Sequence, residues 1–140
     1  MKEDWSAAVR EWMPLAEQGD VHAQYWLGDA YHNGKGVSRD DKIAVKYLRL
    51  AAEQGYSRAQ WKLGVMYYDG YGVQQDYVKA HMWFNVSAAS YVNDVAEGGD
   101  GVAKQRLEWG VLAEKKMTPA QIEEAKKTFS ECVRKKYKGC

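Results

Sequence analysis

The sequence contains no long apolar run and no excess of charge of one sign. No stretch is long enough for a transmembrane helix or for the apolar region of a signal peptide. The chain has 20 Lys and Arg residues against 19 Asp and Glu residues, a formal net charge of +1. This balance gives no indication of a nucleic-acid partner or of insertion into a membrane, and we expect neither.

The lack of an apolar leader leaves two interpretations of the protein's location. The chain is cytoplasmic, or a leader has been removed and the protein is periplasmic or secreted. Asp4 is expected to cap the first helix almost directly after Met1. Such a short lead-in favours the second interpretation.

Residue patterns typical of metal binding or catalysis are also lacking. His22, His32 and His81 do not have the spacing of a metal site, and no cysteine lies near them in sequence. The acidic stretch from Asp94 to Asp100 does not fit the EF-hand pattern. No Ser, His and Asp set shares a recognisable frame. We therefore expect no enzyme activity, no metal and no cofactor.

Phenylalanine is scarce in a chain that is otherwise rich in aromatic residues. Two Phe stand against six Trp and ten Tyr, whose rings keep a polar edge that suits a surface. With 46% hydrophobic and 28% charged residues, the 140 residues are enough for one domain with a real core.

What the sequence does contain is an internal repeat with a step of 36 residues, as from Gly28 to Gly64. Self-similarity at such a period is typical of a solenoid of helical hairpins. The repeated positions are Leu27, Gly28, Tyr31, Gly34, Gly36, Val37 and Asp40, which return as Leu63, Gly64, Tyr67, Gly70, Gly72, Val73 and Asp76.

Each repeat unit has the pattern of two helices joined by a glycine turn. Ala23, Leu27 and Tyr31 follow one another at intervals of four residues and so share one face of a first helix. Asp40 is a good N-cap for a second helix with an apolar face over 44–52. The sequence therefore predicts an antiparallel helix pair in each copy.

Glycine in the middle of the first helix calls for a separate explanation. Gly28 and Gly64 cost about 1 kcal/mol each relative to alanine at such a position. Their recurrence indicates that another backbone comes too close for a Cβ atom. The expected partners are the small residues Ala44 and Ala80 of the second helices.

Outside the two full copies the repeat is incomplete. A first helix over Asp4–Gln18 is expected to kink or end early at Pro14. Near the other end, Thr118, Pro119 and Gln121 form a capping-box start for the last helix. The expected organisation is one domain over 1–140, with a partial repeat at 4–19, repeats at 21–55 and 57–90, a degenerate repeat with an insertion at 91–117, and a capping helix at 118–140.

The pattern A-Q-x-x-L-G-x-x-Y-x-x-G-x-G-V-x-x-D-x-x-x-A, present from Ala23 and again from Ala59, resembles the Sel-one-like repeat (SLR) family. Tetratricopeptide repeats are the near alternative, but their period is about 34 residues and they lack the Gly-x-Gly-Val turn. The resemblance implies an all-α fold, a right-handed α-α superhelix of antiparallel helix pairs with about seven helices. It also implies adaptor functions in signalling, protein quality control, secretion or host interaction, and in some members the neutralisation of toxins.

The two cysteines leave one question open. Cys132 and Cys140 are eight residues apart, which is roughly 12 Å along an unbroken helix and too far for a disulfide. Cys132 also falls on the expected apolar face of the last helix, so we favour a packed thiol. A bridge formed by a turn at Gly139 remains the alternative.

The candidate binding site is the face of the first helices that the repeats do not share. A stripe that varies between copies is under no common packing demand, and in helical solenoids the first helices line the concave surface. The alternative is that its aromatic rings only fill contacts between repeats. The candidate residues are His22, Tyr25, Trp26, Asp29, His32, Arg58, Trp61, Lys62, Tyr68, Arg106 and Trp109.

These observations favour a scaffold that binds a protein or peptide in its concave groove. One alternative is binding of a glycan or peptidoglycan fragment by the groove aromatics. A second, suggested by the resemblance, is a β-lactam-binding or hydrolytic relative. We expect a monomer, with a weak dimer as the alternative.

Overall fold

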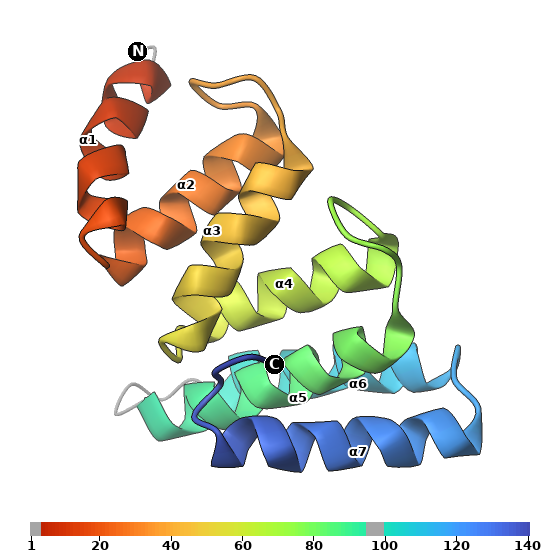
Figure 1. The fold of residues 1–140 in the computed structure, drawn as a ribbon. Helices are drawn as coiled ribbons and strands as arrows, with labels where there is room; N and C mark the ends of the chain where they lie inside the picture. The colour runs from red at the N-terminus through yellow and green to blue at the C-terminus, as the bar shows by residue number, and fades with distance from the viewer. Residues whose placement is uncertain (1–3, 95–99) are drawn as a thin grey trace.

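The computed structural model describes residues 4–94 and 100–140, and this part of the chain consists of seven α-helices without strands (Figure 1). The all-α fold expected from the sequence is confirmed. The helices are α1 (Trp5–Glu17), α2 (Val21–Asn33), α3 (Asp41–Glu53), α4 (Ser57–Asp69), α5 (Tyr77–Asp94), α6 (Asp100–Glu114) and α7 (Pro119–Arg134).

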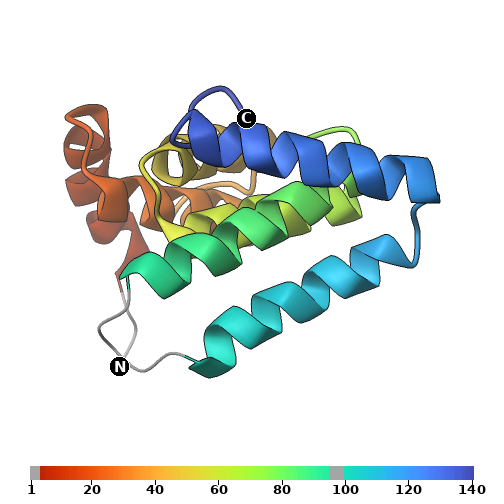
Figure 2. The same ribbon diagram turned by 90° about the horizontal axis from the view of Figure 1, so that it is seen from below.

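The helices stack in chain order. From α1 to α6 each helix packs against the next one, and α7 packs back against α5. Figure 2 shows α5 lying between α6 on one side and α7 on the other. The helices α2 and α4 are therefore the first members of two successive pairs, with α3 and α5 as their second members, and α6 continues the stack beyond α5.

The mid-helix glycines lie where two helices of one pair touch. A Cβ atom on Gly28 would be 2.7 Å from Cγ of Leu48 and 3.2 Å from the carbonyl oxygen of Ala44. A Cβ atom on Gly64 would meet Phe84 at 2.7 Å and the carbonyl oxygen of Ala80 at 3.3 Å. The close approach predicted at Ala44 and Ala80 is confirmed, and a large side chain one turn further along completes each contact.

The second glycine of each turn has a packing reason that the sequence did not reveal. Gly72 has a φ of +71°, and a Cβ atom there would collide with the carbonyl group of Asp41. Gly36 makes the equivalent contact with the backbone of Trp5, 36 residues before Asp41. Each turn thus rests on the start of the preceding second helix, so the glycines also fix the spacing between repeats.

The helix starts agree with the sequence analysis. The Asp40 carboxylate accepts hydrogen bonds from the backbone N–H groups of Lys42 and Ile43. Thr118 and Gln121 form the predicted capping box. The early end expected as one outcome at Pro14 does not occur, because α1 continues to Glu17.

The prediction of a free thiol at Cys132 is wrong, because Cys132 and Cys140 form a disulfide with 5.6 Å between their Cα atoms. Cys132 is buried as expected, at 2% exposure. A separation of roughly 12 Å holds only along a continuous helix, and α7 ends at Arg134. Lys136 and Tyr137 then adopt positive φ angles of 52° and 71°, which turns the chain back toward the helix.

The loop closed by this disulfide lies on the turn between α3 and α4. The backbone N–H of Gly139 donates a hydrogen bond to a carboxylate oxygen of Glu53 at 3.1 Å. The ring of Tyr137 lies against Gly55 and lines a small pocket there with Val21. The last residues therefore connect the end of the solenoid to its middle.

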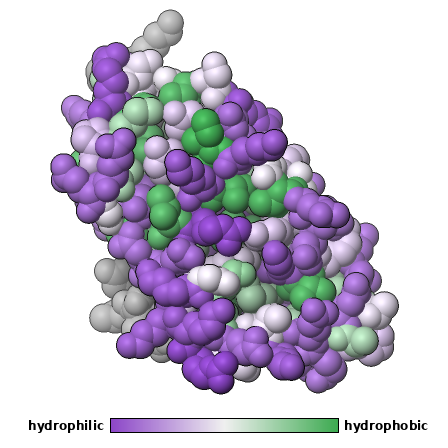
Figure 3. Space-filling view, viewed as in Figure 1, coloured by the Kyte–Doolittle hydropathy of each residue, from purple (hydrophilic) through white to green (hydrophobic). Residues whose placement is uncertain are grey.

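The outer surface is largely hydrophilic in the view of Figure 3, most clearly in the lower part where α7 lies. This agrees with the expected polar outer face of a terminal helix. None of the described helices combines the length and the apolar character that a membrane span requires.

Candidate functional site

The expected binding stripe lies on α2, α4 and α6. The positions that recur between copies point into the core: Ala23, Leu27 and Leu63 are 2%, 0% and 0% exposed. The stripe residues occupy other faces of the same helices and are joined by side-chain contacts from one first helix to the next, as described below.

On α2 the stripe begins with a row of aromatic rings. Trp26 is 38% exposed and stacks on Trp12 of α1, with 6.2 Å between the ring centroids. Tyr25 contacts both Trp26 and Tyr56, each at 5.3 Å. Tyr25 itself is only 6% exposed. An exposed Trp thus rests on a buried Tyr that joins α2 to the start of α4.

Between α4 and α6 the rings form a second, larger cluster. Trp61 and Tyr68 of α4 each contact Trp109 of α6 edge-on, with centroids 6.2 Å apart. Trp109 also lies 5.7 Å from Phe84, which is fully buried. Cζ of Arg106 lies 5.3 Å from the ring centroid of Trp61. The cluster therefore reaches from the core to the surface.

Charged residues connect the two aromatic groups. The guanidinium of Arg58 lies over the ring of Tyr25 at 5.9 Å. The Lys62 ammonium approaches the Asp29 carboxylate to 3.8 Å, and both side chains are 19% exposed. These contacts join α2 to α4 just as Arg106 and Trp109 join α4 to α6. The stripe is continuous over three helices.

The two histidines of the stripe lie at its margins. His22 is exposed and contacts the edge of Tyr56 at 5.3 Å. His32 lies at the other end of α2, where its Nδ1 is 2.8 Å from a carboxylate oxygen of Asp41. His32 therefore connects α2 to α3 and does not join the aromatic groups.

The stripe is less open than the sequence analysis assumed. Tyr25 and Arg106 are each 6% exposed, so the expectation of open groove positions is wrong for these two residues. Tyr25 is covered from the start of α4, by Tyr56 and Arg58. Arg106 is enclosed by Trp61 of α4 and Tyr91 of α5. The remaining stripe residues are half-buried or exposed: His22, Trp26, Asp29, His32, Arg58, Trp61, Lys62, Tyr68 and Trp109.

Three aromatic residues of this surface were missed. Trp12 belongs to the partial repeat, to which the stripe was not extended. Tyr56 lies at the N-cap of α4 and Tyr91 near the end of α5, so neither is on a first helix. Tyr56 directly precedes α4 in sequence, and this position could have identified it. Tyr91 reaches the stripe only because α5 packs on α6.

The environment of Tyr25 predicts a dependence of stability on alkaline pH. Burial, with the nearby Asp29 carboxylate, raises the pKa of Tyr25 to about 12, against about 10 in an unfolded chain. The folded state therefore holds the phenol proton more tightly. The resulting stabilisation is fully present below about pH 10 and is lost as the pH rises toward 12.

We expect the free energy of unfolding to fall more steeply above pH 10 in the wild-type protein than in Tyr25→Phe, which cannot ionise. Urea denaturation at pH 9 and pH 11 measures the two slopes. Parallel slopes would show that Tyr25 is not shielded from water in solution.

Two histidine–carboxylate pairs join neighbouring helices. One is His32 with Asp41, and the other is His81 with Glu114, whose atoms are also 2.8 Å apart. In the described ranges, neither pair is hydrogen-bonded to a Ser, Thr or Cys side chain. Those ranges also contain no group of three His, Cys, Asp or Glu side chains that could hold a metal ion.

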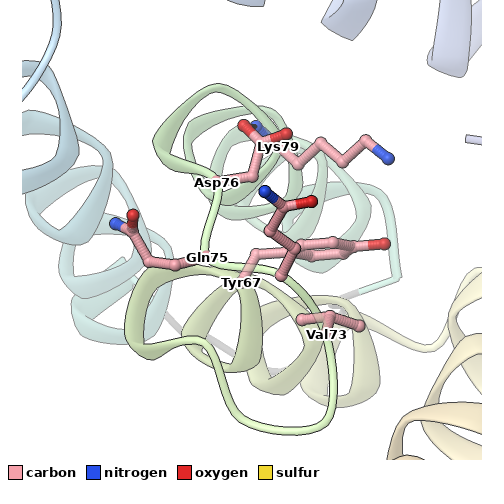
Figure 4. Close-up of a pocket in the computed structure, with 6 residues that line it drawn as sticks. Tyr67, Val73, Gln75, Asp76 and Lys79 are labelled. Carbon is pink, nitrogen blue, oxygen red and sulfur yellow. Dashed lines mark hydrogen bonds between the residues drawn. The ribbon is translucent and has the colours of Figure 1, made fainter.

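A pocket of about 410 Å³ lies between the end of α4 and the start of α5. Figure 4 shows the Tyr67 ring in it, with Val73, Gln75 and Asp76 of the turn and Lys79 of α5 around it. The Tyr67 hydroxyl accepts a hydrogen bond from Arg49 of α3. None of the candidate stripe residues lines this pocket.

The profile of the Sel1 repeat matches residues 21–56 and 57–90, which together are half of the chain. The chain belongs to the Sel1 repeat family. Both matches contain a first helix, a glycine turn and a second helix of the stack. A Sel1 repeat array is a helical scaffold that commonly serves protein interactions.

Two solved structures of Sel1-type repeats are similar to this Sel1 repeat protein. One is a protective antigen present in uropathogenic Escherichia coli strains that displays an SLR fold, with 34% identity and a TM-score of 0.80. The other is a Sel1 repeat protein from Oxalobacter formigenes, with 25% identity and a TM-score of 0.59. They match 98% and 94% of this chain, which spans only 27% and 57% of their lengths. Among curated protein sequences, none matches.

Proposed function

We propose that this Sel1 repeat protein is an interaction module that binds a segment of a partner protein along α2, α4 and α6. The observation that carries the proposal is the continuity of the stripe. Side chains from four successive repeat units, the two incomplete ones included, touch one another from Trp12 to Trp109, although the repeat pattern places no common demand on those positions.

The residue types of the stripe support a protein partner. Trp, Tyr and Arg are the residues that most often dominate the energy of protein interfaces. Trp26 and Arg58 are exposed, while Tyr25 beneath them is buried. An interface built this way holds its contact residues in place before the partner arrives, which lowers the entropy cost of binding.

The glycan alternative has less support from the same contacts. Glycan binding by stacking needs an accessible ring face. Cationic groups of Lys62 and Arg106 lie 5.9 Å and 5.3 Å from the ring centroid of Trp61, and Trp109 packs against it edge-on. A peptide can bind to the ring edges and charged groups of such a surface, whereas a sugar ring has little accessible ring face to stack on.

The disulfide supports a location for this function. Disulfides persist in oxidising compartments and are rare in the cytosol. The Cys132–Cys140 bridge therefore favours the periplasmic or secreted interpretation over the cytoplasmic one. Mass spectrometry of the protein isolated under thiol-blocking conditions would measure whether the bridge is formed in its native compartment.

The binding proposal is tested with two exposed aromatic residues. Peptides are first selected on the wild-type protein from a random dodecapeptide display library, and their affinities are measured by fluorescence anisotropy. Trp26→Ala is expected to weaken binding roughly thirtyfold, since a central aromatic contact is worth about 2 kcal/mol. Tyr71→Ala is the matched control, because Tyr71 is 41% exposed and meets the stripe only at its margin, through His32.

The control variant should bind within twofold of wild type. If Tyr71→Ala weakens binding as much as Trp26→Ala, or if neither variant does, the stripe is not the binding surface. Circular dichroism of both variants checks that the helix content is unchanged.

A further inference from the structure

Arg106 is a cation in an enclosed position. The side chain is 6% exposed, and its guanidinium carbon lies 5.3 Å from the ring centroid of Trp61 and 6.0 Å from that of Tyr91. Its Nε atom is fully buried and has no hydrogen-bond partner among the residues that the structure describes. The aromatic rings lie against the guanidinium group but cannot accept the Nε–H hydrogen bond as a carboxylate would.

The described surroundings of Arg106 also disfavour its charge. Among the side chains that the structure describes, no carboxylate forms an ion pair with it. Burial and the positive charge of Arg58 both lower the pKa of Arg106. Enclosing a cation beside another cation costs free energy that no described contact returns. An anion supplied from outside would remove this cost.

Arg58 is a second, solvent-accessible cation near Arg106. It lies on the first turn of α4, is exposed, and is held over the ring of Tyr25. The nearest acid of the stripe, Asp29, already has Lys62 as its partner. The two arginines therefore form a positive spot on the stripe that its own acid does not neutralise.

We propose that Arg58 and Arg106 form a subsite that binds a carboxylate of an acidic segment in the partner protein. This inference rests on the proposed function and adds the chemistry of the partner. A guanidinium group presents parallel N–H donors that match the two oxygens of a carboxylate. Ring contacts with Tyr25, Trp61 and Tyr91 already restrict both guanidinium groups, so little side-chain freedom is lost on binding.

The carboxylate has two sources, the side chain of Asp or Glu and the C-terminus of the partner. The probes are the dodecapeptides selected on the wild-type protein, synthesised with a free C-terminus. Each is made in three forms: unchanged, with Asp and Glu replaced by Asn and Gln, and with an amidated C-terminus. Loss of affinity in the second or the third form identifies the source.

The protein variants are Arg106→Met, Arg58→Gln and the control Arg49→Gln. Arg106→Met keeps most of the apolar stem, so its melting temperature is expected to be unchanged or slightly higher, because an unpaired buried charge is removed. Its affinity for the unchanged peptide is expected to fall at least tenfold. Arg58→Gln is expected to lower the affinity as well, and its exposed position means that the fold is not affected. Arg49 lies on α3 beside Tyr67, away from the stripe, and its variant should bind like wild type.

The decisive measurement is whether the loss of the peptide carboxylate still weakens binding once Arg106 has been replaced. Neutralising the peptide carboxylate should weaken binding to wild type at least tenfold and binding to Arg106→Met less than twofold. Equal affinity of charged and neutral peptides for wild type overturns the carboxylate subsite. If Trp26→Ala still weakens those peptides, the proposed function survives that result. If the library yields no peptide whose binding depends on Trp26, both proposals are overturned.

Discussion

Replacing Gly64 by leucine is expected to abolish the cooperative folding of the stack, whereas Leu63→Ala should only weaken it. A Cβ atom on Gly64 would already lie 2.7 Å from the Phe84 ring and 3.3 Å from the carbonyl oxygen of Ala80. The ring cannot easily withdraw, because Phe84 is fully buried and packs against Trp109. The further atoms of leucine can be accommodated only if α4 and α5 separate.

The neighbouring Leu63 gives the matched comparison. It is also fully buried, so truncation to alanine removes contacts and leaves a cavity, at a cost of about 2–5 kcal/mol. Inserting a large side chain into a filled contact commonly costs about 1–3 kcal/mol, and more where backbones must move. Here two helix backbones are involved, so we expect the inserted leucine to destabilise the protein more than the cavity left by Leu63→Ala.

Thermal denaturation followed by circular dichroism measures both effects. Leu63→Ala should show a cooperative transition at a lower temperature, and Gly64→Leu should show reduced helix content without a sharp transition. Gly64→Ala is an intermediate control that adds the Cβ atom alone. A melting temperature near wild type for Gly64→Leu would mean that α4 and α5 are not in close contact in solution.

The contact at Gly64 illustrates why much of the fold could be predicted. A glycine in a helix is unfavourable by itself, so its return after 36 residues points to a cause outside the helix. The same reasoning identified Ala44 and Ala80 as partners. Repetition separates the positions that every copy needs from those that one copy uses, and the packing face follows from the first group.

The candidate site could be predicted only in part, because exposure depends on the neighbouring repeat. The repeat pattern correctly assigns Tyr25 and Arg106 to faces that vary between copies. It does not specify that side chains of α4 and α5 then cover them. The positions on the stripe can therefore be predicted from the sequence. The burial of Tyr25 beside the exposed Trp26 cannot, because it comes from Tyr56 and Arg58 at the start of α4.

The Cys132–Cys140 disulfide was the less favoured alternative for a different reason. The estimate of the distance from Cys132 to Cys140 assumed one continuous helix, and the sequence after Arg134 gives little warning of its end. Lys136 and Tyr137 adopt positive φ angles, which are uncommon for residues with side chains. Tertiary contacts of this loop with Glu53 and Gly55 accompany the turn, so local sequence preference could not have predicted it.

Removing residues 118–140 is expected to make the protein aggregate. This segment contains α7, which packs along α5 and buries Ala125 and Cys132 there. Phe129 and Tyr137 also pack against the main core. Deletion would expose the apolar side of α5, and a short solenoid has little stability to lose.

A variant that loses only the covalent bond separates the helix from the bridge. Cys132→Ala with Cys140→Ser keeps α7 but opens the loop, at an expected cost of about 2–4 kcal/mol. This variant should remain monomeric with a lower melting temperature. Light scattering and circular dichroism should show large, partly unfolded species for the deletion alone. A monodisperse, fully helical monomer after deletion would mean that α7 is an appendage, and that α5 is stable when packed only against α4 and α6.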